Sequence, residues 1–590
     1  MALRQPRPAG SPTTEPVHLT VAAPTVRRER LWSLLPLSLS LFLASSIFWA
    51  PYAAPWALAV GIIVFFGYWL VRSYGVVFAC FAGLRRLKQW KATNWPAKYC
   101  SWLPGHADAP TWAWARHMVI IPNYKESEEG LARTLDSLAA QANASQLVIV
   151  MAMEDREAEA RAKSAALILR YRTRFADMFA TFHPYGLPKE TPGKGSNEAW
   201  AAREAYERLI ERGHGDIARY TITSCDADAV FHPHHFEALN YLFLTAPDRY
   251  RTFWQPAIFN SNNIWDIPAP LRIPDGLSGV NRMSNLLMPG SVRFPTSCYS
   301  LSWQMLHEVD YWDEEVIPED WHIFMKCSFT LGDRVNCQGL FLPLGNDCVL
   351  TDGWFKTLRA HYFQSVRHAW GCTDIAYAWR STLNKQSPLS MKRKLLLSGA
   401  VTKVHSFWMA QWYIVTLGVF VPSFLDSHAG ARMPAIWTYR FQIPGPGWHP
   451  EYALDPSRWF RFNETGLVET SMWVNLPGLL VAICIFPLLA LIVFEYLSRG
   501  PRPDYVSRKK AIAQLAIWPL MGVITFFFAS LPALHAQVKL ARGKGLVYRV
   551  AEKGSRKVAV PVGAAAARRV SETVAEPYGA AGGGGGGGGA

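Results

Sequence analysis

Residues 220–228 read YTITSCDAD, an apolar run that ends in two aspartates two positions apart. The residues of 220–224 are the aromatic and β-branched types that are common in strands. Asp226 and Asp228 follow this run, so on an extended chain both side chains would point to the same side. One carboxylate could then hold a divalent cation while the other contacts sugar or ribose hydroxyls. Because Asp-x-Asp also occurs by chance on solvated loops, its meaning depends on the rest of the chain.

The sequence around this run predicts an α/β domain between about residues 112 and 380. Short strands alternate there with helices, which is typical of a sheet covered by helices. Residues 117–122 (HMVIIP) and 146–151 (QLVIVM) read as buried strands, and residues 161–178 suit a helix. Open α/β sheets bind ligands at the carboxyl ends of their parallel strands. We therefore expect a binding site at the end of 220–224.

Two further segments carry groups suited to a charged substrate. Residues 192–197 (PGKGSN) predict a flexible loop whose Lys194 ammonium and exposed amides suit a diphosphate, although the spacing differs from that of a P-loop and a surface turn is the alternative. Residues 316–321 (VIPEDW) place Glu319 and Asp320 after an apolar stretch and beside an aromatic ring. Partial desolvation there could tune Asp320 toward general base catalysis.

A third segment precedes the return of hydrophobic sequence. Residues 361–371 read HYFQSVRHAWG and combine a permanent cation, an amide and several aromatic rings. An arginine suits a departing diphosphate, and flat aromatic faces suit sugar rings. The segment is therefore a candidate for binding both the leaving group and a sugar.

Taken in order, these motifs resemble those of the family 2 glycosyltransferases, and specifically the membrane-embedded group that includes cellulose, chitin and hyaluronan synthases. The resemblance covers roughly residues 117–371 and implies a GT-A-like domain that binds a nucleotide sugar. Residues 122–126 (PNYKE) resemble the P-x-Y-x-E element of the family, which packs around the nucleotide base. The donor-binding residues that it implies here are Pro122, Tyr124 and Glu126.

The same resemblance assigns roles to the acidic and basic side chains. Lys194 matches the lysine before the D-x-D motif, Asp226 the acid that binds the donor, and Asp228 the acid that binds the metal. Glu319 and Asp320 resemble the end of the T/E-D motif, whose aspartate is the catalytic base, with proline in place of the usual threonine. The base-binding acid of the family corresponds to Glu154 or Asp155.

The last motif departs from the pattern Q-x-x-R-W of the membrane synthases. Gln364 and Arg367 match it and are implied to bind the donor, but His368 stands at the position of the tryptophan. Trp321 or Trp370 could take over the stacking of the acceptor. Processive chain growth and transfer of a single sugar thus remain alternatives. Residues 548–554 (YRVAEKG) resemble the F-x-V-T-x-K gating segment of cellulose synthases.

The resemblance implies a single displacement with inversion at the anomeric carbon. The expected donor is a nucleotide sugar, with UDP as the nucleotide, and the expected acceptor is a glycan or a lipid. Carboxylate and phosphate ligands favour Mg²⁺ or Mn²⁺ as the cofactor. A non-catalytic membrane scaffold or a transporter is the alternative from another class, but the hydrophobic runs lack the ionisable groups that transporters usually carry inside their spans.

Hydrophobic runs flank the α/β region on both sides. About 20 apolar residues cross a bilayer, and residues 31–82 contain two such runs, which predicts a transmembrane hairpin. Three further uncharged runs, at 406–425, 471–494 and 511–534, predict a membrane region over 400–538. The chain is therefore expected to be a multi-pass membrane protein with the bilayer as a partner.

Basic residues predict the orientation, because Lys and Arg in short loops stay in the cytosol. They flank the hairpin and the α/β region, which places the catalytic domain in the cytosol, while the loop 426–470 reads as external. Three C-terminal spans would put the basic part of the tail 539–590 outside, against the charge rule. Pro519 and Pro532 could instead break the last run into a re-entrant or interfacial element.

The whole composition agrees with a membrane enzyme. The 590 residues carry a formal net charge of +15, and the basic residues lie beside the hydrophobic runs, so we expect no nucleic acid partner. Nine cysteines without a C-x-x-C pair predict free thiols. The segment 1–30 and the Gly-rich end of 539–590 are expected to be disordered. The membrane would be that of the Golgi or ER, the plasma membrane, or the inner membrane of a bacterium.

Overall fold

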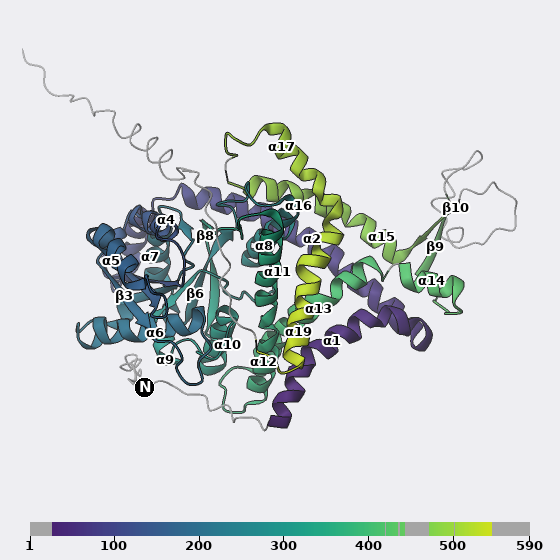
Figure 1. Ribbon diagram of the computed structural model, residues 1–590, viewed down its shortest axis with the longest axis horizontal. Coiled ribbons are helices and arrows are strands. Elements are labelled where there is room, and N and C mark those ends of the chain that lie inside the picture. The colour runs from purple at the N-terminus through teal and green to yellow at the C-terminus, as the bar shows by residue number, and fades with distance from the viewer. Residues whose placement is uncertain (1–25, 419, 435–436, 443–470, 501, 546–590) are drawn as a thin grey trace, which may run out of the picture. The chain divides into compact units, whose positions relative to one another are not determined.

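The computed structural model describes residues 26–418, 420–434, 437–442, 471–500 and 502–545. Three stretches for which the sequence made predictions lie outside these residues: 1–25, most of the expected external loop (443–470), and 546–590, which contains the segment 548–554. Figure 1 shows the described elements, and the labels used below are those of the figure.

An eight-stranded mixed sheet forms the centre of the α/β domain, in the order β3-β2-β1-β4-β7-β6-β8-β5. β1 to β4 are parallel to one another, β7 is antiparallel to both of its neighbours, β6 and β8 are parallel, and β5 closes the sheet antiparallel to β8. The strands are β1 (Arg116–Asn123), β2 (Leu147–Glu154), β3 (Asp177–His183), β4 (Tyr220–Ser224), β5 (Val230–Phe231), β6 (Thr252–Phe259), β7 (Tyr299–Ser302) and β8 (Asn336–Gly345). The α/β prediction is confirmed.

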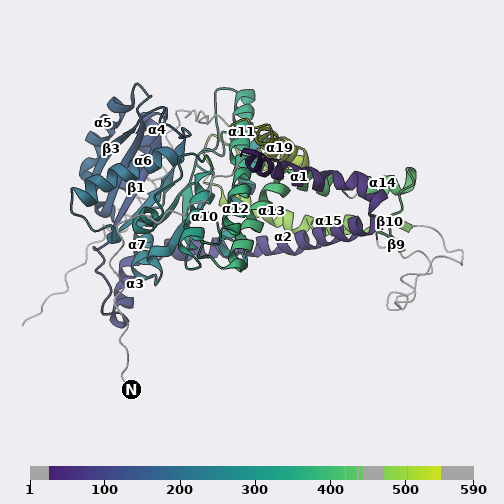
Figure 2. The same ribbon diagram turned by 90° about the horizontal axis from the view of Figure 1, so that it is seen from below.

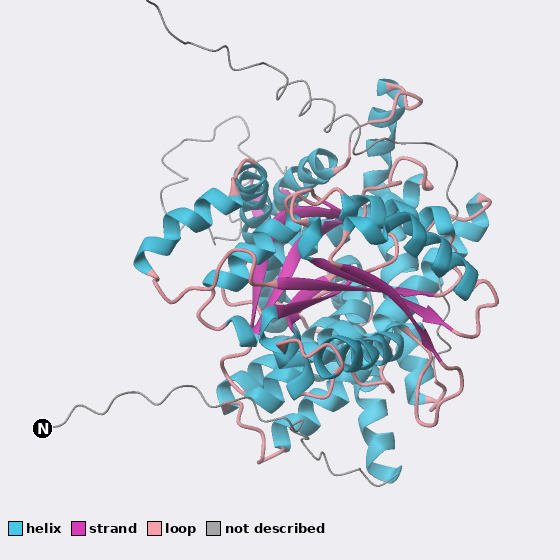
Figure 3. Cartoon of the chain, turned by 90° about the vertical axis from the view of Figure 1, so that its left-hand side faces the viewer, coloured by secondary structure: helices cyan, strands magenta, loops and turns pink. Residues whose placement is uncertain are grey.

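Helices cover both faces of this sheet (Figure 3). Successive residues of a strand point to opposite faces, and in β1 Val119 joins the core that contains Leu135 of α4, whereas Ile120 joins the core that contains Ala202 of α6. Two buried faces explain why residues 118–121 of β1 and 147–153 of β2 form continuous apolar runs rather than alternating. The helices of the domain are α3 (Trp95–Trp102), α4 (Glu128–Ala139), α5 (Ala160–Tyr171), α6 (Lys194–Tyr206), α7 (His235–Thr245), α8 (Arg272–Leu287), α9 (Trp303–Glu308), α10 (Glu319–Leu331), α11 (Trp354–Ala369) and α12 (Asp374–Leu383).

The predicted helix over 161–178 is wrong in its second half. α5 ends at Tyr171, and β3 begins at Asp177 and pairs in parallel with β2. The Tyr171 hydroxyl donates to the carbonyl oxygen of Ala132 (3.2 Å) and so fixes the end of α5 against α4. β3 lies at the edge of the sheet, and its pairing with β2 is a contact between distant segments that local periodicity does not report.

Long apolar helices flank the domain in the chain, as the sequence predicts. Among the described residues four are long and apolar enough to cross a membrane: Arg30–Ala53, Pro55–Lys91, Gly478–Ser498 and Ala511–Ala541. Figure 2 shows α1 (Val26–Ala53) and α2 (Pro55–Lys91) as two long helices that follow one another in the chain. The second of them continues past residue 82, the predicted end of the hairpin.

Two of the predicted C-terminal runs differ from continuous helices. The run at 406–425 is divided between α13 (Met391–Thr416) and α14 (Phe420–His428), which meet at 50°. The run at 471–494 starts with β10 (Ser471–Asn475), which pairs antiparallel with β9 (Thr438–Gln442). Only after this strand do α15 (Leu476–Ile483) and α16 (Ile485–Ser498) begin.

The last hydrophobic run contacts the α/β domain at both of its ends. It is broken into α17 (Arg508–Ala513), a 3-10 turn, α18 (Met521–Thr525), a π turn and α19 (Leu531–Ala541). Ala511 shares a core with Cys348, whereas Ala533 shares one with Ile317 and Val366. Pro519 lies in the 3-10 turn. Between these ends Trp518 and Ile524 share a core with Ile273 of α8, so the broken helix contacts the domain along its length.

α8 lies between the sheet and two of the apolar helices. Val280 and Met283 of α8 pack in one cluster with Phe259 of β6, Cys80 of α2 and Phe494 of α16. α2 approaches closely because residue 83 is a glycine: a Cβ there would lie 2.3 Å from the Met283 sulfur. The α/β domain and the apolar helices thus share a packed interface.

Candidate active site

The two aspartates of the D-x-D motif lie in a turn at the end of β4. The amide N–H of Ala229 donates to the carbonyl oxygen of Asp226 (3.1 Å) and closes the turn. The predicted extended conformation is therefore wrong, because the chain has to turn here before β5 begins at Val230. β4 does run parallel to β1, so the turn lies at the carboxyl ends of parallel strands.

Asp226 and Asp228 have different surroundings. Asp226 accepts from the Asn346 side-chain amide (3.1 Å) and from the Ser297 hydroxyl. Asp228 is only 4% exposed, and one of its oxygens accepts the backbone N–H of Asp347 (2.7 Å). Asp228 is thus buried, and it also anchors the segment that follows β8.

Lys194 opens helix α6 and does not lie in a flexible loop. Gly193 caps the helix, and the Gly193 backbone N–H donates to the Ser196 hydroxyl (3.2 Å). This geometry directs Lys194 into the protein. Its ammonium nitrogen lies 3.0 Å from Asp226, 3.2 Å from Glu319 and 4.0 Å from Glu198, and it donates to the carbonyl oxygen of Ser297 at 2.6 Å.

The electrostatics of this cluster follow from burial and from the excess of acids. Burial lowers the pKa of Lys194, but Asp226, Glu198 and Glu319 together hold it well above its usual value. Burial raises the pKa of Glu198 to about 8, although Lys194 opposes the shift. The ammonium is therefore permanently charged and shared among several carboxylates.

Asp320 has the properties of a general base at neutral pH. Burial, followed by the charge of Glu319, raises the pKa of Asp320 to about 7, against the backbone N–H of Trp321 and the charge of Lys194. The two oxygens of Asp320 accept N–H bonds from Trp321 (2.8 Å) and Ser297 (3.2 Å), which fix the carboxylate in position. A pKa near the working pH is what general base catalysis requires.

Ser297 connects the two halves of the site and was not singled out from the sequence. Its N–H faces Asp320, its hydroxyl faces Asp226 and its carbonyl faces Lys194. Its φ of 61° lies in the left-handed region that non-glycine residues rarely adopt. Such local strain often marks functional sites. It precedes β7, and no local sequence signal identifies it.

The residues expected to surround the nucleotide base gather at the ends of β1 and β2. Glu126 accepts the backbone N–H of Tyr124 (2.7 Å), and the Arg156 guanidinium lies 4.1 Å from the centre of the Tyr124 ring. Glu154 is buried and lies 3.0 Å from Arg156 and 3.3 Å from His183. Pro122 belongs to β1 itself. Arg156 and His183 were not predicted.

Asp155 points elsewhere. Its carboxylate is about half exposed and pairs with Arg161 at 2.8 Å. Of the two acids after β2, Glu154 therefore lies nearer to Tyr124 and Arg156. The structure favours Glu154 as the base-binding acid.

Comparison with known proteins gives the family. Residues 221–437 match the model of the glycosyl transferase family group 2, and this segment starts in β4 and includes the D-x-D turn, Asp320 and α11. The chain carries a family 2 glycosyltransferase domain. No curated protein matches this glycosyltransferase.

One solved structure with likeness to the glycosyltransferase is the mannosyltransferase PcManGT from Pyrobaculum calidifontis in complex with GDP-Man and Mn²⁺. The identity is 12% and the TM-score is 0.37, over 78% of this chain and 99% of that chain. A TM-score this low carries no argument. The assignment rests on the family match.

The remaining motif of the glycosyltransferase lies on α11. Gln364 and Arg367 are half-buried on this helix. His368, at the position of the tryptophan of the Q-x-x-R-W motif, is exposed on the same helix.

The two candidate rings for the acceptor differ in exposure. Trp370 is 7% exposed and packs in the cluster that contains Ala533 and Ala536 of α19. Trp321 is half-buried and stacks on Phe294 with 4.3 Å between ring centres. Trp321 also adjoins Asp320 in the chain, so its position favours acceptor contact over that of Trp370.

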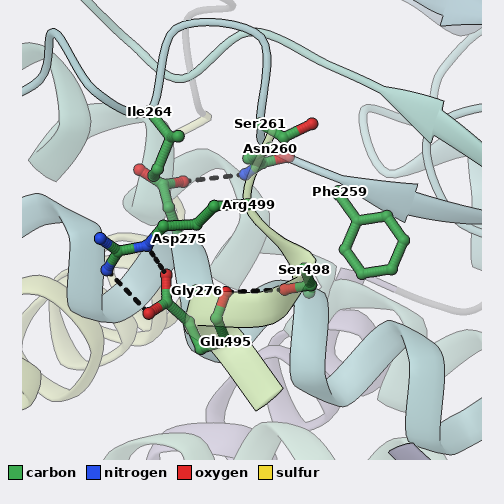
Figure 4. A pocket seen from close by; sticks show the side chains of 10 residues that line it. Phe259, Asn260, Ser261, Ile264, Asp275, Gly276, Glu495, Ser498 and Arg499 are labelled. Atoms are coloured by element: carbon green, nitrogen blue, oxygen red, sulfur yellow. Dashed lines mark hydrogen bonds and ion pairs between the residues drawn. The ribbon is translucent and has the colours of Figure 1, made fainter. Parts of the chain in front are cut away.

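A small pocket lies where α8, α16 and the end of β6 meet (Figure 4). On one side Glu495 and Arg499 form a two-pronged ion pair at 2.6 and 2.7 Å, and a Cβ on Gly276 would lie 2.5 Å from Glu495. On the other side Asn260 donates to Asp275 at 2.8 Å. The pocket marks close packing between the glycosyltransferase domain and an apolar helix.

The D-x-D acids fit a hard divalent cation. Within the described part of the chain, no three His, Cys, Asp or Glu side chains come together as a metal cluster. Carboxylate oxygens are the donors that Mg²⁺ and Mn²⁺ prefer, and Mg²⁺ commonly binds one or two carboxylates together with substrate phosphates. The donor set at Asp226 and Asp228 suits a metal that the nucleotide helps to hold.

Proposed function

We propose that this glycosyltransferase moves a hexosyl group from a nucleotide sugar to a hydroxyl of a glycan or lipid acceptor at a membrane, with inversion and with a divalent metal. The observation that carries the proposal is the cluster at Lys194, Asp226, Ser297 and Asp320. In this cluster Ser297 lies within hydrogen-bonding distance of three groups. These are the carboxylate of Asp226, the permanently charged ammonium of Lys194 and the fixed carboxylate of Asp320, whose pKa is raised.

The mechanism is a single displacement. Asp320 takes the proton of the acceptor hydroxyl while that oxygen forms a bond to the anomeric carbon from the side opposite the nucleoside diphosphate. The bond between the anomeric carbon and the diphosphate oxygen breaks, and its electron pair leaves with the diphosphate. Lys194 and Arg367 stabilise the charge that develops there, the contribution that is usually largest in such reactions. A Mg²⁺ or Mn²⁺ at Asp228 supplies further charge stabilisation when bound.

The surroundings of Glu154 support UDP as the nucleotide. The Arg156 guanidinium lies beside its carboxylate at 3.0 Å, whereas both ring nitrogens of His183 face carboxylates, Glu154 at 3.3 Å and Glu190 at 2.9 Å. The edge of uracil presents an N–H between two carbonyls, which suits a carboxylate acceptor beside a guanidinium donor. Guanine presents two adjacent N–H groups instead.

Release of nucleoside diphosphate from a panel of UDP- and GDP-sugars, by purified membranes with acceptor extracts, tests the function. We expect release from at least one UDP-sugar, lost on chelation of divalent metal and in membranes with the Asp320→Asn variant. Release from none of the donors would favour the non-catalytic scaffold or transporter. The size of the labelled product separates the processive synthase from the transfer of one sugar.

Replacing Asp228, the proposed metal-binding acid, should remove metal-dependent donor binding without unfolding the protein. Because Asp228 is buried and holds the Asp347 N–H, Asp228→Ala would disturb the turn, so Asp228→Asn is the better variant. It keeps an acceptor oxygen but removes the charge. We expect metal-dependent donor binding to be lost with an unchanged melting temperature, measured by titration of donor with and without Mn²⁺. Donor binding as tight as in the parent with metal present would contradict the assignment.

The membrane part of the proposal includes the side of the C-terminal tail. Both ends of the last hydrophobic run contact the catalytic domain, at Ala511 and at Ala533, which supports a re-entrant or interfacial element. A tag placed after residue 545 should therefore be protected in sealed vesicles whose lumen is the cytosolic side. A tag in the loop 443–470 is the matched control and should be accessible from outside. Accessibility of both tags would mean that the last run crosses the bilayer.

A further inference from the structure

A second cation lies beside the D-x-D turn. Arg282 of α8 donates from its Nη1 to the side-chain oxygen of Asn260 (3.0 Å), and Asn260 is itself fixed by its bond to Asp275. Asn260 directly follows β6, whose last carbonyl, that of Phe259, accepts the backbone N–H of Asn346 (2.9 Å). Asn346 in turn reaches Asp226 at 3.1 Å. Neighbouring strand ends thus place the Arg282 guanidinium close to the site.

Arg282 is not paired directly with any carboxylate of the described residues. Among the residues that the structure describes, Arg282 forms no ion pair, and the side chain that it contacts is a neutral amide. Burial lowers the pKa of Arg282, while Asp226, Asp275 and Asp320 act in the other direction. Arginine stays protonated in proteins, so this is a half-buried positive charge within the electrostatic reach of both a D-x-D acid and the candidate base.

Lys194, by contrast, is already neutralised. Its ammonium lies within 4.0 Å of three carboxylates, those of Asp226, Glu198 and Glu319. The cluster around Lys194 is therefore not net positive, and it cannot by itself compensate a diphosphate. Besides Arg367, a further cation without a direct carboxylate partner on another side of the site would help to compensate the diphosphate, and a guanidinium can bind two phosphate oxygens at once.

We propose that Arg282 binds the diphosphate of the donor, with Asn260 holding its guanidinium in place. This inference rests on the proposed function, because it assumes that a nucleotide sugar occupies the site. Arg282 then belongs to the groups that hold the leaving group, on a helix that also packs against α2 and α16.

A series of ligands of increasing phosphate content tests the role. Uridine, UMP and UDP, and the guanosine series in parallel, are titrated with Mn²⁺ into the full-length protein in detergent. For Arg282→Gln we expect affinity for the diphosphate to fall about 10- to 100-fold, as for lost hydrogen bonds to a charged group. Affinity for the nucleoside should be unchanged. Arg282→Lys keeps the positive charge but not the planar guanidinium, so its affinity for the diphosphate should fall less.

The control is Arg334→Gln. Arg334 pairs with Asp248 on the surface just before β8 begins at Asn336, away from the strand ends that carry the site, and its replacement should leave the whole series unchanged. Equal loss of nucleoside and diphosphate binding in Arg282→Gln would overturn the inference in favour of a structural role, and so would an unchanged diphosphate affinity. If the parent binds neither nucleotide series, the proposed function fails instead, so the two failures are distinguishable.

Discussion

Asp320→Asn is expected to lower turnover by about 10²- to 10⁴-fold, the usual contribution of a general base, while donor affinity stays close to that of the parent. The amide has nearly the same shape, and its single oxygen can still accept one of the two backbone N–H bonds that Asp320 accepts from Trp321 and Ser297. Single-turnover transfer and donor titration measure the two quantities separately. Weakened donor binding with normal turnover would give Asp320 a binding role and make another carboxylate the base.

The pH profile gives the same hypothesis a second test. Only the deprotonated carboxylate can accept a proton, and the pKa of Asp320 is raised to about 7, so kcat/KM of the parent should fall as the pH drops below about 7.

Glu319→Gln is the matched control for the base assignment. The charge of Glu319 is the second cause of the raised pKa of Asp320, so its removal should move the acid limb to lower pH. This variant should keep more activity than Asp320→Asn. If the acid limb of the pH profile does not move in Glu319→Gln, that limb reflects the ionisation of a group other than Asp320.

The acids and the lysine could be found from the sequence because each lies in a short motif with local meaning. Ser297 and Asn346 could not, because they reach Asp226 from 71 and 120 residues away in the chain. Arg282 also lies far from Asp226 in the chain, and nothing in its helix distinguishes it from a surface arginine. The parts of the site that distant strands contribute exist only once the sheet has formed.

Local conformation was predicted less well than residue identity. Residues 192–197 read as a loop because of their glycines, yet Gly193 caps α6 and Lys194 starts it. Glycine is common both in loops and at the N-caps of helices, so the same residues fit the predicted loop and the observed start of α6. For the last hydrophobic run, composition predicted an apolar helix, and only its contacts at Ala511 and Ala533 show that both ends meet the catalytic domain.

Lys194→Met should have the largest combined effect on folding and activity. It removes the ammonium that lies within 4.0 Å of Asp226, Glu198 and Glu319. Breaking a buried ion cluster by deleting one partner costs about 3–5 kcal/mol, so we expect a lower melting temperature near pH 8 together with loss of donor binding. Lys194→Arg is the control: it keeps the charge and should recover more of the stability than of the activity.

The stability deficit of Lys194→Met should depend on pH in a defined direction. The pKa of Glu198 is already raised to about 8 and that of Asp320 to about 7, and loss of Lys194 raises both further. At pH values between the ordinary carboxyl pKa and these raised pKa values, the folded state therefore binds more protons than the unfolded state. Stability consequently falls as the pH rises through this window. Melting curves at pH 5.5 and pH 8 should show a smaller deficit at pH 5.5, because protonated carboxyls no longer repel one another. An equal deficit at both pH values would mean that Lys194 stabilises the fold by packing and not by compensating the acids around it.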